Sequence, residues 1–262
     1  MNKIFLLIFI FLLQTGFAKN SSYIVLDAKT NKVLSGEHIE DKLPIASLTK
    51  IWVALIVIEN SNLDAKVKIS KKASYQEGSS IYLKENQICS VRDLLYGMLL
   101  RSGNDAAVAL AEHVFGSEKE FVKVMNKRLK EVGIKNTNFV NVTGFDDKNH
   151  FSTAKDVAEM LNIALKNYKF KGISSSINYK NSLTGETWKN KHKLLGEQSV
   201  LNHTTNLAFS GKTGFTKIAG RTLATAFVKD ENIHIVVTLN EPNDWKIHQV
   251  LADKTYKNKK KI

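Results

Sequence analysis

One stretch of the chain, residues 47–59, decides how the rest is organised: Ser47-Leu48-Thr49-Lys50-Ile51-Trp52-Val53-Ala54-Leu55-Ile56-Val57-Ile58-Glu59. A helix that is apolar on every face is buried, so this segment is predicted to form the central helix of the fold. Residues three apart share one face of a helix, which places the Lys50 amine beside the Ser47 hydroxyl. Burial lowers a lysine pKa, so a neutral Lys50 can accept the serine proton, and the helix N-terminus favours negative charge on the serine oxygen. The stretch therefore predicts a serine nucleophile with its own base.

Two further triplets follow in a fixed order. Ser102-Gly103-Asn104 comes 55 residues after Ser47, behind the apolar stretch 94–100, and Lys212-Thr213-Gly214 comes 110 residues after Ser102, ahead of a strand-like run. Each triplet is common alone. The ordered set SxxK, SGN and KTG resembles the signature of penicillin-binding proteins and class A β-lactamases.

The resemblance is closest to the D-alanyl-D-alanine carboxypeptidases, low-molecular-mass penicillin-binding proteins of serine peptidase family S11, and covers roughly residues 23–239. The segments that carry it are Pro44–Ile51, Arg101–Glu112, Gly133–Asp156 and Gly211–Thr216 followed by Ala219-Gly220. It implies an enzyme that acts on peptidoglycan stem peptides without a cofactor and is trapped covalently by β-lactam antibiotics. No HExxH or CxxC arrangement occurs, so no metal site is expected.

The resemblance and the chemistry together assign four catalytic residues. Ser47 is the nucleophile and Lys50 is its base. Ser102 can move a proton toward the leaving amine. The Asn104 amide can bind a substrate carbonyl or hold Lys50.

Five residues are predicted to bind substrate. Lys212 and Thr213, on an edge-like strand, can hold a peptide's terminal carboxylate by charge-assisted hydrogen bonds. Gly214 lets the substrate backbone approach closely. By similarity to the family, the backbone N–H of Phe215 and that of the nucleophilic serine form an oxyanion hole. Arg221 adds a second carboxylate contact or is simply a solvated strand arginine.

The predicted fold class is α+β, an antiparallel sheet flanked by helices with an additional all-helical lobe, as in β-lactamases and transpeptidases. Strands are expected at both ends of the chain, at 23–27, 32–35, 222–229 and 233–239. Helices are expected at 47–59, 93–101, 105–115, 118–132, 152–167 and 245–256, with the SGN triplet in the connection between the second and third.

Residues 1–18 have the pattern of a secretory signal peptide, with Lys3, an apolar core from Ile4 to Leu13 and the small residues Gly16 and Ala18. The expectation is an exported, periplasmic or cell-envelope protein whose residues 19–262 form one catalytic domain without the C-terminal β-domain of larger relatives. An uncleaved membrane anchor is the alternative.

The formal net charge of +13 suits anionic ligands, such as the carboxylates of stem peptides, and peripheral contact with an anionic membrane surface. A lysine-rich composition explains the charge equally well. Nucleic acid is not an expected partner, since no binding motif is present. The single cysteine, Cys89, is expected to pack in the core.

Four functions are compared. A D,D-carboxypeptidase is favoured, and a D,D-endopeptidase that cleaves peptidoglycan cross-links is the closest alternative. A β-lactamase would require a glutamate in an E-x-x-L-N segment, and the nearest match, Glu159-Met160-Leu161-Asn162, is one residue too short. A non-enzymatic binder is disfavoured because Ser47, Lys50, Ser102 and Lys212 are all intact.

Overall fold

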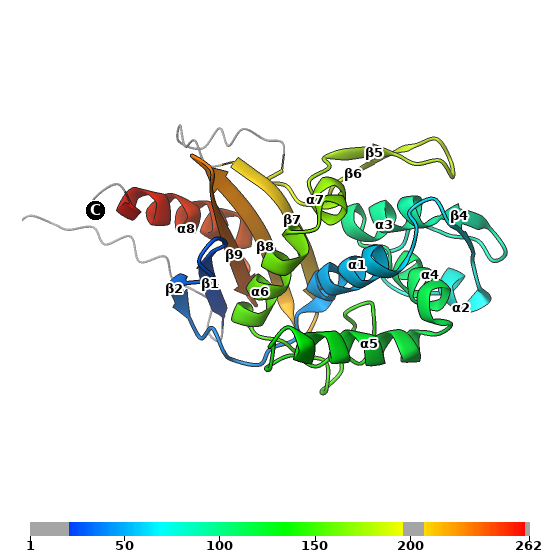
Figure 1. Cartoon of the computed structure of the whole chain (residues 1–262), viewed down its shortest axis with the longest axis horizontal. Coiled ribbons are helices and arrows are strands. Elements are labelled where there is room, and N and C mark those ends of the chain that lie inside the picture. The colour runs from blue at the N-terminus through cyan, green and yellow to red at the C-terminus, as the bar shows by residue number, and fades with distance from the viewer. Residues whose placement is uncertain (1–20, 196–206, 260–262) are drawn as a thin grey trace, which may run out of the picture.

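The computed structural model describes residues 21–195 and 207–259, so the predicted signal segment 1–18 lies outside it. Within the described residues, five strands form one antiparallel sheet in the order β2-β1-β9-β8-β7 (Figure 1). Their bounds are β1 (Ser22–Asp27), β2 (Val33–Glu37), β7 (Leu207–Thr216), β8 (Gly220–Lys229) and β9 (Asn232–Leu239). The sheet and its helices confirm the predicted α+β class. The KTG triplet lies on an edge strand, β7, as predicted.

Successive side chains of a strand point to opposite faces of the sheet, and apolar side chains occur on both faces here. Helices therefore cover both faces. Ile24 and Leu26 belong to the main core, on the side of α6 (Ala154–Leu165). Val25 points the other way and packs with Ile247 and Leu251 of α8 (Asp244–Lys259). Figure 1 shows α6 and α8 on opposite faces of the sheet.

The helical lobe surrounds α1 (Thr49–Asn60), whose residues 49–58 are all buried. This helix contacts α3 (Val91–Leu100), α4 (Asn104–Phe115), α5 (Glu118–Glu131), α6 and α7 (Tyr168–Ser174), which confirms the prediction of a central helix. The Trp52 indole N–H donates to the carbonyl oxygen of Met125, 3.1 Å away in α5. The lobe also contains the short helix α2 (Lys71–Ser74).

The predicted start of the central helix was wrong by two residues. Ser47 lies in a 3-10 turn, η1 (Ala46–Leu48), and the α-helix begins at Thr49. Ala46 has a φ of 49°, a left-handed conformation that an α-helix cannot contain. Ser47 therefore projects from a tight turn ahead of the helix.

Several short elements were not predicted. They include α2, α7, a two-stranded sheet of β3 (Lys66–Lys68) and β4 (Ile88–Ser90) with α2 between them in sequence, and a small hairpin of β5 (Asn178–Lys180) with β6 (Thr187–Lys189). Three-residue strands are too short to show an alternating pattern. Cys89 lies in β4 and is buried, which raises its pKa to about 11 with the help of Asp93 and Asp105, so it packs as predicted.

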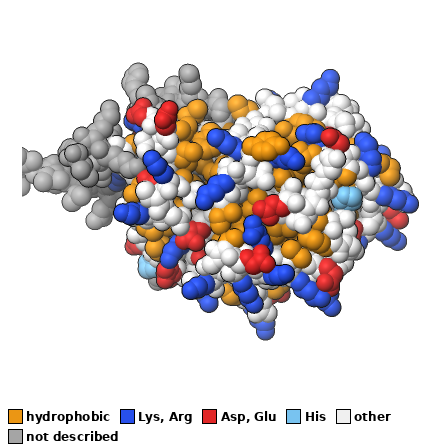
Figure 2. Space-filling view, viewed as in Figure 1, with side chains coloured by type: hydrophobic (Ala, Val, Ile, Leu, Met, Phe, Trp, Pro, Cys, Tyr) orange, Lys and Arg blue, Asp and Glu red, His pale blue; other side chains and the backbone are white. Residues whose placement is uncertain are grey.

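Lysine and arginine side chains are spread over the face shown in Figure 2, with acidic side chains between them. Across residues 21–195 and 207–259, no helix is both long and apolar enough to cross a membrane.

Candidate active site

The three motifs meet at a hollow of ≈380 Å³ between β7 and the helical lobe. It is lined by Ser47, Ser79, Ser102, Lys191, Lys193, Thr213, Gly214, Phe215, Arg221, Asp244 and Trp245. We call this hollow the catalytic groove. Residues more than 100 positions apart in the chain thus share one small surface, as the ordered motifs predicted.

Lys50 lies directly beside Ser47 although the turn between them is not α-helical. Its Nζ donates to Ser47 Oγ at 2.9 Å, to Asn104 Oδ1 at 2.7 Å and to the Thr143 carbonyl oxygen at 2.6 Å. The side chain is fully buried, and this burial, with the charges of Lys212 and Lys191, holds the pKa of Lys50 well below its ordinary value. A neutral amine in this position can accept the hydroxyl proton of Ser47.

The turn that carries Ser47 is held by a buried chain of hydrogen bonds. Thr49 Oγ1 donates to the Ala46 carbonyl oxygen at 2.8 Å and lies 2.8 Å from Nε2 of His150. The Val140 backbone N–H donates to His150 Nδ1, so the proton of the neutral ring sits on Nε2 and is donated to Thr49. Burial lowers the pKa of His150 to about 4. His150, to which sequence analysis gave no role, therefore supports the strained conformation of Ala46.

Gly144 packs against the other side of the same turn. Its φ is 86°, and a β-carbon there would overlap the carbonyl group of Ala46 and lie 2.9 Å from the Ser47 nitrogen. The Asn141 side chain accepts from the Thr143 and Gly144 N–H groups at 3.2 and 2.8 Å and fixes the loop. This loop therefore positions both the serine turn and the Thr143 carbonyl that holds Lys50.

The SGN triplet forms a rigid connection between α3 and α4. Ser102 has a φ of 67°, and the Gly103 N–H donates to the Gly97 carbonyl oxygen at 3.1 Å. The Asn104 N–H donates to the Ser79 carbonyl oxygen at 2.7 Å, and its side-chain amide donates to the Glu77 carbonyl oxygen. Asn104 is thereby oriented with its oxygen toward the lysine amine.

Lys212 is buried behind Ser102. Its Nζ donates to Ser102 Oγ at 3.0 Å and to the Thr213 carbonyl oxygen at 2.7 Å. Burial, with the charge of Lys191, lowers the pKa of Lys212 to about 7. Lys212 therefore lies next to the groove and also contacts the Ser102 hydroxyl. The contact with Ser102 was not predicted from the sequence.

Strand β7 approaches the serine turn closely at Gly214. A β-carbon at Gly214 would overlap the Thr222 hydroxyl and lie 3.0 Å from the Ser47 nitrogen. Thr213 and Phe215 line the groove on either side of it, and Phe215 is 67% exposed. The strand backbone therefore forms one wall of the groove, against the backbone of Ser47.

Arg221 closes the groove at the end nearest α8. Its guanidinium donates to Asp244 Oδ1 from Nε and Nη2, at 3.1 and 2.9 Å, and lies over the Trp245 ring. The arginine is thus paired with Asp244 at the groove while its side chain remains 39% exposed, so its contact with a substrate carboxylate stays a prediction.

Sequence analysis missed several lining residues, among them Ser79, Lys191, Lys193 and Trp245. Lys191 Nζ donates to Ser79 Oγ at 3.2 Å. These residues belong to no motif, and Lys191 is one of 38 basic residues in the chain, so no sequence signal singled it out.

Comparisons with known proteins agree with the geometry. A family model described as D-alanyl-D-alanine carboxypeptidase matches residues 15–243. The D-alanyl-D-alanine carboxypeptidase DacF of Bacillus subtilis is 41% identical over 150 residues, which are 55% of this chain and 39% of that protein. The D-alanyl-D-alanine endopeptidase of Escherichia coli is 33% identical over 211 residues, 78% of this chain and 66% of that protein. The chain thus spans well under half of the first relative and about two thirds of the second.

Solved structures show the same fold. Penicillin binding protein 5 from Haemophilus influenzae superposes with a TM-score of 0.79 at 29% identity, over 90% of this chain and 69% of that one. A D-alanyl-D-alanine carboxypeptidase from Mycobacterium tuberculosis superposes with a TM-score of 0.77 at 25% identity, over 86% and 85% of the two chains.

Proposed function

Because this chain belongs to the D-alanyl-D-alanine carboxypeptidase family, we propose that it is a serine D,D-peptidase that removes the terminal D-alanine from peptidoglycan stem peptides. The observation that carries the proposal is the contact of 2.9 Å between Ser47 Oγ and the buried Lys50 amine. It supplies a nucleophile beside an amine whose pKa is held well below its ordinary value by burial, which favours the neutral form that acts as a base.

In the proposed acylation step, Ser47 Oγ attacks the carbonyl carbon of the D-Ala–D-Ala bond and its proton passes to neutral Lys50. The backbone N–H groups of Ser47 and Phe215 stabilise the oxyanion. The C–N bond then breaks, and the departing amine takes a proton from the Ser102 hydroxyl. Lys212, whose Nζ donates to Ser102 Oγ, replaces that proton. The proton that Lys50 took from Ser47 then passes through water to Lys212, so both amines return to their starting states.

Deacylation uses the same groups in reverse roles. A water molecule attacks the ester carbon, and its proton passes to Lys50, which is neutral again after D-alanine has left. The ester C–O bond breaks, and Ser47 Oγ recovers its proton from the lysine. Asn104 and the Thr143 carbonyl keep the amine within reach of the hydroxyl throughout.

Substrate binding is assigned to the β7 side of the groove. Thr213 and protonated Lys212 would bind the terminal carboxylate by charge-assisted hydrogen bonds, and Gly214 allows the substrate backbone to lie against the strand. Arg221, already paired with Asp244, would add positive potential at the end of the groove.

β-Lactams would follow the same acylation path, since their strained amide mimics the scissile bond, and would remain as an ester on Ser47. Rapid release requires a placed glutamate as in class A β-lactamases. Glu159 lies on α6 and is not among the residues that line the catalytic groove. The amide of its neighbour Asn162 donates to the Ala28 carbonyl oxygen, beside the sheet. A β-lactamase function is therefore disfavoured.

A D,D-endopeptidase is the second candidate. One observation supports it: D-alanyl-D-alanine endopeptidases of Escherichia coli, Pseudomonas aeruginosa and Haemophilus influenzae match 78%, 80% and 82% of this chain at 30–33% identity. The same groups would act, because a cross-link presents the same D-alanyl carbonyl to Ser47.

The proposal includes the place of action. We assign residues 1–18 to a secretory signal and residues 19–262 to the peptidase domain, and place the enzyme in the cell envelope where its substrate lies. The family match begins at residue 15.

Product analysis on defined muropeptides tests the function. The purified enzyme is incubated with monomeric pentapeptides, and released D-alanine is quantified for wild type and Ser47→Ala. We expect stoichiometric D-alanine from wild type and none from the variant. Pentapeptides left intact by the wild type would reject the carboxypeptidase assignment.

A further inference from the structure

A buried carboxylate next to the SGN triplet has no part in the proposed chemistry. Asp105 is the second residue of α4 and is 1% exposed. Its Oδ2 accepts from the Ser80 hydroxyl at 2.6 Å and from the Ile81 and Leu83 N–H groups, each at 3.1 Å. All three donors belong to the loop that follows α2. We call Glu77–Leu83 the anchored segment, because this one carboxylate binds it to α4.

The anchored segment reaches the active site through Asn104. The Glu77 carbonyl oxygen accepts from Asn104 Nδ2 and the Ser79 carbonyl oxygen accepts from its backbone N–H, both at 2.7 Å. With Nδ2 held there, Asn104 turns Oδ1 toward the Lys50 amine, 2.7 Å away. Gly78 lies so close that a β-carbon on it would be 2.9 Å from Asn104 Nδ2. A shift of the segment would therefore move the amide that holds the base.

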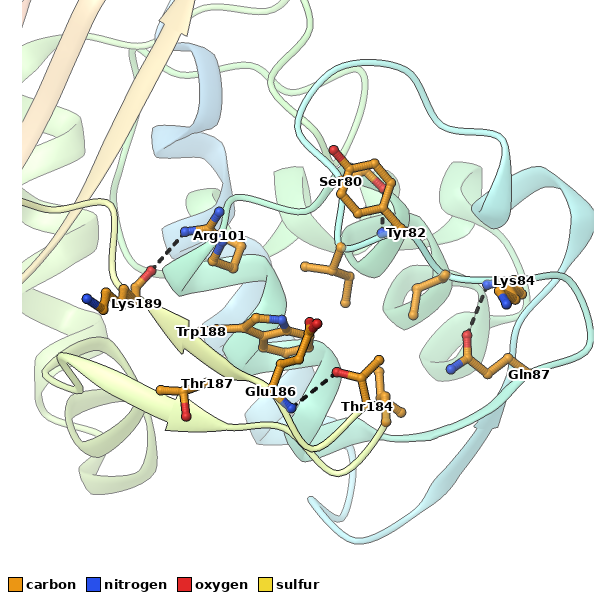
Figure 3. A pocket seen from close by; sticks show the side chains of 13 residues that line it. Ser80, Tyr82, Lys84, Gln87, Arg101, Thr184, Glu186, Thr187, Trp188 and Lys189 are labelled. Atoms are coloured by element: carbon orange, nitrogen blue, oxygen red, sulfur yellow. Dashed lines mark hydrogen bonds between the residues drawn. The ribbon is translucent and has the colours of Figure 1, made fainter.

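Packing holds only part of the anchored segment. Leu83 is buried in the main core, but the outer side of the segment faces a second hollow, of ≈550 Å³. Figure 3 shows Ser80 and Tyr82 on one side of this hollow, with Thr184 and Glu186 of the β5–β6 hairpin on the other. Tyr82 is 86% exposed and has a φ of 61°, a conformation that a non-glycine residue adopts at a cost. Polar contacts are therefore needed to keep the segment in place.

The glycine of the SGN triplet leaves room for the carboxylate. A β-carbon at Gly103 would lie 2.8 Å from Asp105 Oδ1 and 3.3 Å from the Ile81 side chain. The triplet, the carboxylate and the anchored segment thus pack as one unit behind the catalytic groove.

We propose that Asp105 is a positioning residue for acylation, which fixes the anchored segment and thereby holds the Asn104 oxygen toward Lys50. The inference rests on the proposed function, in which Lys50 takes the Ser47 proton. Asp105 does not line the catalytic groove, so it acts through Asn104. Without the carboxylate, the segment moves, Asn104 Nδ2 loses its acceptor, and the amide is free to turn away from the amine.

The charge of Asp105 has the opposite effect on the base. Burial, with the charges of Lys212 and Lys191, lowers the pKa of Lys50, and the Asp105 charge opposes this lowering. Loss of the charge alone would favour neutral Lys50 and would not slow acylation. Slower acylation without the carboxylate therefore reports the position of Asn104.

A matched pair of substitutions tests the proposal. Asp105→Asn keeps the size of the side chain, but either orientation of its amide turns the NH2 group toward backbone N–H groups that need an acceptor. The control is Asp93→Asn. Asp93 is also 1% exposed, lies in the first turn of α3, and accepts from the N–H and hydroxyl of Ser182 in the β5–β6 hairpin. Neither Asp93 nor Ser182 lines the catalytic groove.

A milder pair keeps both carboxylates. Ser80→Ala and Ser182→Ala each remove one hydroxyl donor, the first from Asp105 and the second from Asp93. For every protein, stopped flow with a fluorescent penicillin gives the acylation rate at saturation and the concentration for half of that rate. Urea denaturation gives the stability. Asp105→Asn is also made in an Asn104→Ala background.

We expect Asp105→Asn to lower the saturating rate roughly 10- to 100-fold, with the half-saturating concentration near the wild-type value. Ser80→Ala should lower the rate by a smaller factor. Both controls should react within about twofold of wild type, although all variants unfold at lower urea concentrations, because distant sites act independently. In the Asn104→Ala background, Asp105→Asn should change the rate less than about twofold, since the group through which it acts is gone.

Two results would overturn the inference. One is a folded Asp105→Asn that reacts as fast as Asp93→Asn or, if Asp105→Asn does not fold, a Ser80→Ala that reacts as fast as Ser182→Ala. The other is a double variant in which the two rate losses multiply, because Asp105 would then act by another route than Asn104. Failure of the proposed function looks different: the wild type itself would not be acylated, and the role of Asp105 would fall with it.

Discussion

The contact between Gly144 and the serine turn allows the sharpest test of how Ser47 is positioned. Gly144→Ala adds one methyl group to a residue with a φ of 86°, and that methyl group overlaps the Ala46 carbonyl. The left-handed backbone alone costs a non-glycine residue about 1–2 kcal/mol. Inserting a carbon into a packed site adds about 1–3 kcal/mol, so the free energy of unfolding should fall by about 2–5 kcal/mol.

The effect on catalysis should exceed the effect on stability. Relieving the overlap requires a shift on the order of 1 Å in either the Ser47 turn or the Thr143–Gly144 loop, and a misplacement of that size costs roughly 100-fold in rate. Both segments touch the reacting groups, because Thr143 holds the Lys50 amine. We therefore expect the second-order rate of penicillin acylation to fall about 100-fold in protein that is still folded.

Two matched controls separate strain from misplacement. Gly116 and Gly133 have φ values of 77° and 82°, and a β-carbon at either meets no atom within 4 Å. Gly116→Ala and Gly133→Ala should each lower the free energy of unfolding by about 1–2 kcal/mol and leave acylation within about twofold of wild type. Urea denaturation and stopped-flow acylation measure the two quantities. If folded Gly144→Ala reacts as fast as Gly116→Ala, the loop does not position Ser47.

Three further predictions concern titration. Lys50→Arg keeps the charge but cannot supply a neutral amine near pH 7, so penicillin acylation should drop at least about 1,000-fold. Circular dichroism checks that the fold is intact, and an active variant would place the base elsewhere. The value of kcat/KM for pentapeptide should rise with pH as Lys50, whose pKa is lowered by burial, loses its proton. It should fall again above about pH 7, because the pKa of Lys212 is lowered to about 7 and neutral Lys212 no longer attracts a carboxylate. Lys212→Arg should move the falling limb to higher pH, and an unmoved limb would assign it to another group. Burial lowers the pKa of His150 to about 4 and of His192 to about 3, and that of His248 also lies well below its ordinary value. The unfolded chain binds these protons near pH 6.5 while the native state does not, so stability is fully present above pH 6.5 and is lost as the pH falls, by roughly 1.4 kcal/mol per histidine per pH unit. Urea midpoints that are equal at pH 7 and pH 5 would contradict this.

The sequence predicted the elements whose patterns are long and regular. The all-apolar run after Lys50 could only be a buried helix, and it is. The strands predicted at 222–229 and 233–239 form the β8–β9 hairpin, with Asp230 and Glu231 in left-handed conformations at the turn. The strands show the alternation of a buried hairpin, and the helix is identified by the length of its unbroken apolar run.

Backbone groups escaped prediction because no side chain identifies them. The Thr143 carbonyl that holds Lys50 and the close packing of Gly144 depend on how a loop folds back over residues 93 or more positions away in sequence. The start of the helix was misplaced for a related reason. Nothing in an alanine indicates a φ of 49°, and the bonds that stabilise it come from Thr49 and the distant His150.

The second hollow, of ≈550 Å³ and lined by residues that include Arg101 and Trp188, was not predicted for a third reason. It is assembled from a loop, a helix end and a hairpin of three-residue strands, and its cations are ordinary surface lysines in a chain of net charge +13. Only their arrangement around Trp188 and beside the SGN connection sets them apart.

The central claim, that Ser47 is the acylated nucleophile, is tested most directly by locating a bound penicillin. The protein is incubated with benzylpenicillin, digested with trypsin and analysed by mass spectrometry. Cleavage after Lys42 and Lys50 gives the peptide Leu43–Lys50, in which Ser47 and Thr49 are the hydroxyl-bearing residues. We predict one penicilloyl group on this peptide, on Ser47 by fragmentation, and an unmodified peptide in Ser47→Ala. A penicilloyl group on any other peptide, or undiminished labelling of Ser47→Ala, would contradict the account.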